Sequence, residues 1–263
     1  MQRPPRLPSL RPWIESVWIV ASAQSRREHA IASGNMHLAI RIRGPALRIY
    51  TDTNDRSGRD VAAAVVAGAH AGFYVKRATP GRIVGAQLKP GASWALFGIS
   101  AAELSQRHTP LHVFWVTAAH DLETRLSTAT ESDEQRDLLE QALRSQLRPT
   151  CGLHPEVAGA LACLDACADV EAALADARCS HRHFVAVFRG ATGLAPKRYA
   201  RIRRFSRVLA DAADGATEWS TLALDHGYCD QAHLNRDFRE FTGLSPCAWR
   251  QAQGKHPHHL PME

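Results

Sequence analysis

The stretch CDQAHLNRDFREFTGLSPCAWR, from Cys229 to Arg250, carries two stripes of side chains at helical spacing. The apolar stripe consists of Leu234, Phe238 and Phe241. The polar stripe consists of Gln231, Asn235 and Arg239. The apolar spacing predicts a helix with one buried face. The polar stripe fits either a solvated surface or contact with DNA, because Gln, Asn and Arg match the hydrogen-bonding edges of bases in a major groove.

The same organisation occurs a second time, earlier in the chain. Residues 174–199 read LADARCSHRHFVAVFRGATGLAPKRY, and residues 222–249 read LALDHGYCDQAHLNRDFREFTGLSPCAW. Each unit predicts a short helix, a turn and an amphipathic second helix that begins after a capping residue, Ser180 or Asp230. A long arginine-rich helix opened by Pro196 joins the units. Two such helix-turn-helix units would each present the outer face of a second helix to a major groove.

The distribution of charge favours a polyanionic partner. The chain of 263 residues carries a net charge of +6. Residues 151–263 are balanced, with 13 basic and 13 acidic side chains, but residues 177–210 hold nine basic and no acidic ones. A phosphate backbone responds to such a local patch rather than to the net balance.

Cysteine usage and hydropathy predict a cytoplasmic protein that does not interact with a membrane. All six cysteines lie after residue 150, without the spacing of a disulfide framework. The start, MQRPPRLPSLRPWIE, lacks the apolar core of a signal peptide. The most apolar run, residues 61–75, is too short for a transmembrane helix.

The first part of the chain predicts a mainly β domain. Residues 37–43, HLAIRIR, alternate apolar and polar side chains as a half-buried strand does. Further short apolar segments follow up to residue 88, separated by turn-forming residues, so we expect a sandwich or a cupin-like barrel. Helices come next, and two pairs of residues predict capping boxes at their starts. These pairs are Ser100 with Glu103, and Ser132 with Gln135.

The segment RPTCGLHP, residues 148–155, predicts the domain boundary because it holds two prolines and a glycine. We therefore expect an α+β multidomain fold with an all-α C-terminal domain. Its expected parts are a sensor or dimerisation domain at 1–148, a linker at 149–154, a domain with two helix-turn-helix motifs at 155–254, and a disordered tail at 255–263.

The C-terminal part resembles the DNA-binding domain of AraC/XylS-type transcriptional regulators. GYCDQAHLNRDFREFTGLSP, residues 227–246, is similar to the family signature, and GLAPKRYARIRRF, residues 193–205, is similar to its linker helix. LKPGASWALFGISAAELSQRHTPL, residues 88–111, resembles sensor domains that precede this module. The resemblance implies a bacterial, sequence-specific, effector-responsive regulator without enzymatic activity. It implies double-stranded DNA, RNA polymerase and an unknown small-molecule effector as partners, and a homodimer formed through the N-terminal domain.

The resemblance also implies which side chains meet DNA, through two reading helices at about 181–190 and 231–241. The base-contact candidates are His181, Arg182, Val185, Ala186, Gln231, Asn235 and Arg236. The phosphate-contact candidates are Arg189, Lys197, Arg198, Arg201, Arg204 and Arg239. The first unit departs from the family, because Arg178 stands where a turn glycine is usual. Val185 and Ala186 also replace polar residues, so we expect more shape readout from the first helix.

Two other functions remain open from the residues alone. One is a small-molecule or metal-binding enzyme tethered by its C-terminal domain. The other is a thiol or metal sensor using Cys163 and Cys167, which lie four residues apart. The paired CxxC spacing of structural zinc sites is absent, and so are catalytic and phosphate-loop motifs. We therefore predict neither a cofactor nor a metal site.

Overall fold

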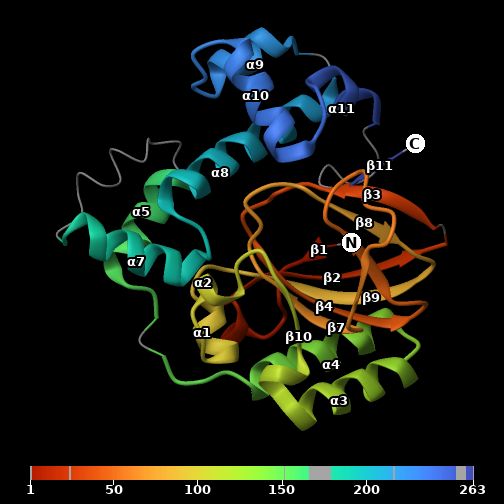
Figure 1. Ribbon diagram of the computed structural model, residues 1–263. Coiled ribbons are helices and arrows are strands. Elements are labelled where there is room, and N and C mark those ends of the chain that lie inside the picture. Colours follow the sequence, from red (N-terminus) through yellow and green to blue (C-terminus); the bar gives the residue numbers. More distant parts are fainter. Residues whose placement is uncertain are drawn as a thin grey trace.

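The computed structural model describes residues 2–23, 25–150, 152–165, 179–215, 217–252 and 259–262. An N-terminal domain of two antiparallel sheets with helices precedes a helical C-terminal domain (Figure 1). The α+β class predicted from the sequence is confirmed. The first helix expected in the first helix-turn-helix unit falls largely on residues 166–178 and therefore lies outside the described residues, as do Cys167 and Arg178.

The two sheets are built from strands that are far apart in the sequence. The order in the first sheet is β1 (Gln2–Arg3), β2 (Ile14–Ser22), β9 (Gly81–Leu88), β4 (Met36–Arg43), β7 (Ala64–Ala67) and β10 (His108–Pro110). The order in the second sheet is β11 (His259–Pro261), β3 (Arg26–Ala30), β8 (Tyr74–Ala78), β5 (Leu47–Tyr50) and β6 (Arg59–Val61). All of these pairings are antiparallel.

Four α-helices are described in the N-terminal domain. They are α1 (Ala92–Phe97), α2 (Ala101–Leu104), α3 (His112–Thr128) and α4 (Ser132–Ser145). The capping box of Ser100 and Glu103 is present at the start of α2. The one expected at Ser132 is wrong, because Glu131 occupies the N-cap of α4. The Gln135 side chain instead donates a hydrogen bond to the Ala129 carbonyl, 2.8 Å away.

The α-helices described in the C-terminal domain are α5 (Pro155–Asp165), α7 (His181–Thr192), α8 (Pro196–Asp211), α9 (Trp219–Asp225), α10 (Gln231–Thr242) and α11 (Pro246–Ala252). Helices α7, α8 and α10 begin where the sequence predicts. Ser180 caps α7 and Asp230 caps α10, each through its side-chain oxygen. Gly193 and Gly243 end these two helices with φ angles of 84° and 76°, a left-handed conformation that glycine adopts without strain.

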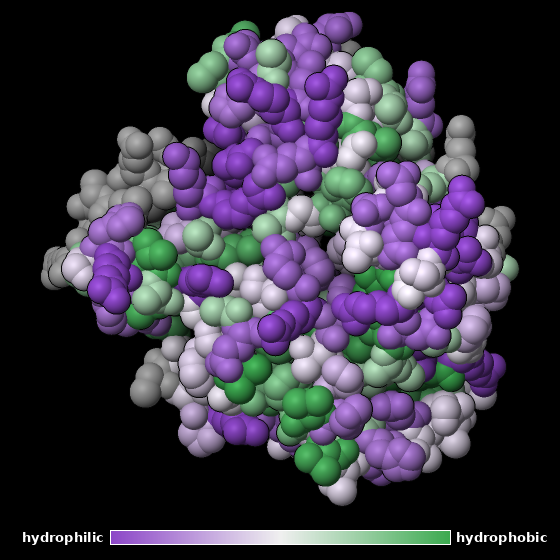
Figure 2. Space-filling model, in the orientation of Figure 1, coloured by the Kyte–Doolittle hydropathy of each residue, from purple (hydrophilic) through white to green (hydrophobic). Residues whose placement is uncertain are grey.

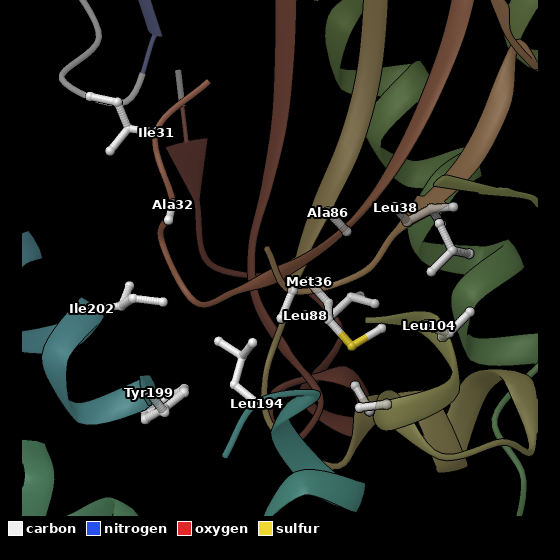
Figure 3. Packing of buried hydrophobic residues seen from close by; sticks show 14 of the residues in the cluster. Ile31, Ala32, Met36, Leu38, Ala86, Leu88, Leu104, Leu194, Tyr199 and Ile202 are labelled. Atoms are coloured by element: carbon white, nitrogen blue, oxygen red, sulfur yellow. The ribbon is translucent and has the colours of Figure 1, made fainter. Parts of the chain in front are cut away.

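One buried core continues across both domains (Figure 3). Leu194, Tyr199 and Ile202 lie opposite Ala32 and Met36 of the N-terminal domain. Apolar surface shared in this way stabilises the contact between the domains, because water is excluded from both sides. The α8 helix is therefore packed against the N-terminal domain rather than free in solvent.

The tail expected to be disordered contains a strand. Residues His259–Pro261 form β11, which pairs with β3, and the Met262 amide donates to the Arg27 carbonyl at 2.9 Å. Leu260 is fully buried. The composition of the tail did not predict this strand. Pairing at a sheet edge uses backbone N–H and C=O groups, which every sequence has, and in β11 only one apolar side chain is buried. The remaining predicted domain boundaries stay predictions.

Candidate nucleic-acid interface

The α10 helix separates a buried face from an exposed polar one. Its apolar stripe, Leu234, Phe238 and Phe241, is fully buried. Gln231, Arg236 and Arg239 are exposed, whereas Asn235 is half-buried. The predicted buried stripe is thus confirmed, and the free polar groups gather on the opposite side of the helix.

The α7 helix has a corresponding exposed face with different chemistry. His181, Arg182, Ala186 and Arg189 are exposed, whereas Val185 is half-buried and packs on the core. Val185 and Ala186 stand at the positions where α10 has Asn235 and Arg236, so the middle of this face is apolar. Figure 2 shows hydrophilic side chains gathered over α10 and the neighbouring part of α8.

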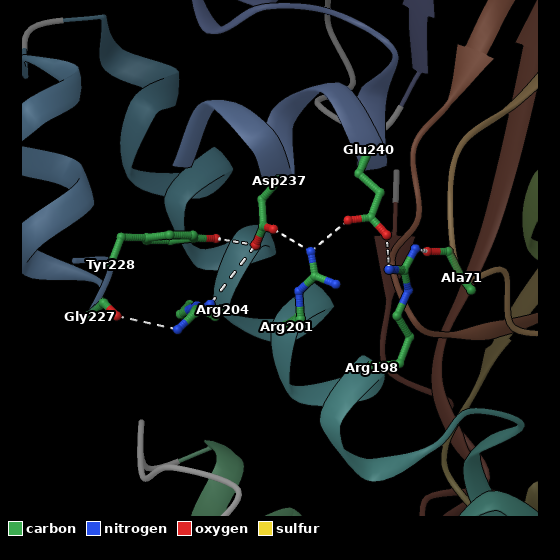
Figure 4. A network of polar contacts seen from close by, with 8 residues as sticks. All are labelled: Ala71, Arg198, Arg201, Arg204, Gly227, Tyr228, Asp237 and Glu240. Carbon is green, nitrogen blue, oxygen red and sulfur yellow. Dashed lines mark hydrogen bonds and ion pairs between the residues drawn. The ribbon is translucent and has the colours of Figure 1, made fainter. Parts of the chain in front are cut away.

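Three arginines of α8 that were predicted to contact phosphate, Arg198, Arg201 and Arg204, bind partners inside the protein (Figure 4). Arg201 lies 2.5 Å from the Asp237 carboxylate and 2.6 Å from that of Glu240. Arg204 donates to the Gly227 carbonyl at 3.3 Å, and its guanidinium lies 4.2 Å from the centre of the Tyr228 ring. These contacts hold α8 against α10 and the turn that precedes it.

Arg198 joins three elements at once. Its guanidinium pairs with Glu240 of α10 and donates a second hydrogen bond to the Ala71 carbonyl of the N-terminal domain. In contrast, Arg189, Lys197 and Arg239 are exposed. The six arginine and lysine side chains predicted to contact phosphate therefore fall into an internal group and an exposed group.

Asp237 is the centre of this polar network, and the sequence reading did not identify it. Its side chain is 0% exposed, and the Tyr228 hydroxyl donates to its Oδ2 at 3.0 Å. Burial, together with the Asp237 carboxylate, raises the pKa of Tyr228, so the hydroxyl stays protonated and remains a donor. The available signal was the position of Asp237, three residues after Leu234, which places an acidic side chain at the edge of the buried stripe.

The described residues offer few of the features that a metal-binding enzyme or a thiol sensor needs. No cluster of three or more His, Cys, Asp or Glu side chains suited to a metal occurs in the part of the chain that the structure describes. Cys163 is half-buried, and its proposed partner Cys167 lies outside that part. Among the described helices, none combines the length and apolar character needed to cross a membrane.

Comparisons with known families define the class of the C-terminal domain. Residues 174–252 match a family model described as a helix-turn-helix domain, and residues 2–110 match a domain of unknown function, DUF6597. The C-terminal domain is thus a helix-turn-helix domain, a fold unit that binds DNA. This assignment holds for residues 174–252, the part of the chain that the family model matches. A comparison with curated proteins found no match.

Among solved structures, the chain is distantly similar to ToxT from Vibrio cholerae. One ToxT structure aligns at 9% identity with a TM-score of 0.42, over 89% of this chain and 96% of that one. ToxT from strain O395 bound to (E)-4-(8-methylnaphthalen-1-yl)but-3-enoic acid aligns at 9% identity and 0.45, over 89% and 97%. Unsaturated fatty acid bound wild-type ToxT from strain SCE256 aligns at 9% identity and 0.39, over 89% and 93%.

Proposed function

We propose that this protein is an AraC-type transcription regulator. It binds a specific DNA sequence by placing α7 and α10 in successive major grooves, and a small-molecule effector controls it. The observation that carries the proposal is the duplicated geometry. Each reading helix begins at a side-chain cap, buries one apolar face and exposes the other, and the single helix α8 joins both units. Helices arranged in this way read half-sites about one helical turn, or 34 Å, apart.

The exposed side chains divide the work between bases and phosphates. Gln231 and Arg236 are exposed and suit base edges, because amide and guanidinium groups bind them in pairs of hydrogen bonds. Arg189, Lys197 and Arg239 are exposed and suit phosphates. The internal partners of Arg198, Arg201 and Arg204 support a role in positioning the two reading helices rather than a direct contact with the backbone.

Alanine variants should separate these roles. Arg236→Ala should weaken binding to the preferred site by about 1–3 kcal/mol and relax preference at one or two base pairs, while non-specific binding is retained. Lys197→Ala should weaken binding to all sequences alike and lower the salt slope by about one unit. Binding isotherms on selected and scrambled duplexes at several salt concentrations measure both effects.

The matched control is Arg250→Ala, because Arg250 donates to the Thr217 carbonyl and lies over the Trp219 ring instead of on a reading face. It should change stability more than sequence preference. If Arg236→Ala binds the selected site with unchanged affinity and preference, the polar face of α10 is only a solvated surface.

A cavity between the domains supports a site for the effector. It has a volume of about 730 Å³ and lies between α1, the linker and α7. Trp94 of α1 is 48% exposed and lines it, together with Arg148 and His154 of the linker region and Ala186 of α7. This volume falls within the range of about 300–1,000 Å³ typical of ligand pockets. A ligand here would touch a reading helix directly, so its affinity would depend on the position of that helix.

The walls of this cavity define which compounds to test. Trp94 offers an aromatic face and Arg148 a cation, so carboxylates with an apolar body are the appropriate set. A compound that changes DNA affinity in the wild type should lose this effect in both Trp94→Ala and Arg148→Ala, whereas DNA binding without the compound persists. An undiminished response in both variants would place the effector site elsewhere.

We also propose RNA polymerase and a second copy of the chain as partners, on the family resemblance.

A further inference from the structure

We infer that one short segment of the N-terminal domain, residues 69–73, holds both helix-turn-helix units at a fixed mutual orientation and so sets the spacing of the DNA sites they read. We call residues 69–73 the bridging segment. The inference rests on the proposed function, because it concerns how the two reading helices address one DNA molecule. Its basis is that the bridging segment contacts the same small turn in each unit.

That turn is the repeated Thr-Gly-Leu at the end of each reading helix. The Thr192 hydroxyl donates to the Phe188 carbonyl at 2.9 Å, and the Thr242 hydroxyl donates to the Phe238 carbonyl at 2.7 Å. Each hydroxyl also accepts a hydrogen bond from the amide two residues later, at 3.2 Å and 3.0 Å. Because each turn is tied to its own helix in this way, fixing the turn fixes the helix.

The first turn packs against the start of the bridging segment. A Cβ added at Gly193 would lie 3.3 Å from the Ala69 Cβ and 3.1 Å from the Ala101 carbonyl oxygen. The Gly91 amide donates to the Ala191 carbonyl at 2.9 Å, one residue before the turn. Gly193 therefore serves two needs, the left-handed backbone that ends α7 and a close approach to the N-terminal domain.

The second turn packs against the end of the same segment. A Cβ added at Gly243 would lie 2.7 Å from the Phe73 ring. His29 stacks on Phe73 at a centroid distance of 5.1 Å, and its Nδ1 lies 2.8 Å from the Thr242 carbonyl oxygen. The imidazole therefore donates to that carbonyl, since a carbonyl can only accept. Between the two turns, the Ala71 carbonyl accepts from Arg198 of α8 (Figure 4).

The bridging segment is itself anchored within the N-terminal domain. The Gln106 amide donates to the Ala69 carbonyl at 3.1 Å, and the Gly68 amide donates to the Arg107 carbonyl at 2.9 Å. The ring of His70 lies 4.5 Å from that of Tyr74 and 5.1 Å from that of His108. The segment thus joins the interior of the N-terminal domain to both helix-turn-helix units.

These contacts leave the proposed reading surfaces free. They use the carboxyl ends of α7 and α10, whereas Arg182, Gln231 and Arg236 remain exposed. A contact that covered these side chains would block DNA. The contacts with the bridging segment leave them exposed. The mutual orientation of α7 and α10 is therefore fixed before DNA binds.

The test is the dependence of DNA affinity on half-site spacing. A site selected from random DNA with the full chain is remade with one base pair added or removed between its two half-sites. One base pair moves a half-site by about 3.4 Å along the axis and also rotates it. Wild type should prefer the original spacing. In Phe73→Ala, and more so in Phe73→Ala with His29→Ala, this preference ratio should fall about fivefold or more, the size of a modest coupling between sites.

Phe114→Ala is the matched control, because Phe114 is also a half-buried phenylalanine of the N-terminal domain but packs on Phe97, away from the turns. Its preference ratio should equal that of wild type, and thermal melts check that all variants are folded. An unchanged ratio in both folded bridging-segment variants, or an equal fall in Phe114→Ala, overturns the inference while the proposed function stands. Wild type that binds with no preferred spacing overturns both.

Discussion

Replacing Asp237 with alanine is expected to lower the free energy of unfolding by about 1–3 kcal/mol, the cost of leaving a buried polar group without its partner. The carboxylate is fully buried, with Arg201 at 2.5 Å and the Tyr228 hydroxyl at 3.0 Å. Without it, Arg201 keeps only the more exposed Glu240, and the buried Tyr228 hydroxyl loses its acceptor. A buried polar group that loses its partner costs more free energy than a hydrogen bond contributes to stability, because the group has lost water without gaining a replacement.

Glu240→Ala is the matched control, because Glu240 lies on the same helix and also binds Arg201. Its side chain is 41% exposed, so water screens the pair and the loss should stay near or below about 1 kcal/mol. Denaturant unfolding of both variants measures the difference. Equal costs for Asp237→Ala and Glu240→Ala would show that burial of the Asp237 pair does not govern its contribution.

Local patterns predicted the helices of the C-terminal domain well. Ser180 and Asp230 cap as expected, and Leu234 and Phe238 are buried as their spacing requires. Such features depend on residues within one or two turns of each other, so the sequence contains all the information that they need.

The functions of the arginines could not be predicted in the same way. Periodicity places Arg198, Arg201 and Arg204 outside the buried face of α8. It does not predict which side chains of another helix will lie next to them. Asp237 and Glu240 arrive from about forty residues away, through the packing of α10 on α8. Contacts that depend on tertiary packing, such as the pairing of β11 with β3, have no local signature. The base and phosphate assignments remain predictions for the same reason.

The two helix-turn-helix units share a buried phenylalanine at the same place, but the rings around it differ. Phe188 and Phe238 occupy equivalent places, and both are fully buried, so alanine at either should cost about 3–5 kcal/mol. Phe238 lies among three other rings, with centroid distances of 4.8 Å to Phe205, 5.0 Å to Trp219 and 5.9 Å to Trp249. Phe188 has two such neighbours, Phe184 at 5.7 Å and Tyr199 at 5.5 Å.

Edge-to-face ring pairs contribute about 0.5–1.5 kcal/mol beyond the area they bury. We therefore expect Phe238→Ala to lower the free energy of unfolding by about 1 kcal/mol more than Phe188→Ala, as measured by denaturant unfolding. It should also weaken sequence preference at the half-site read by α10 more than at the half-site read by α7. Leu224→Ala is the control, because Leu224 is 66% exposed on α9 and should change stability by less than about 0.5 kcal/mol. Equal losses from the two phenylalanines would mean that ring geometry adds nothing here, and that apolar burial alone holds each reading helix against α8.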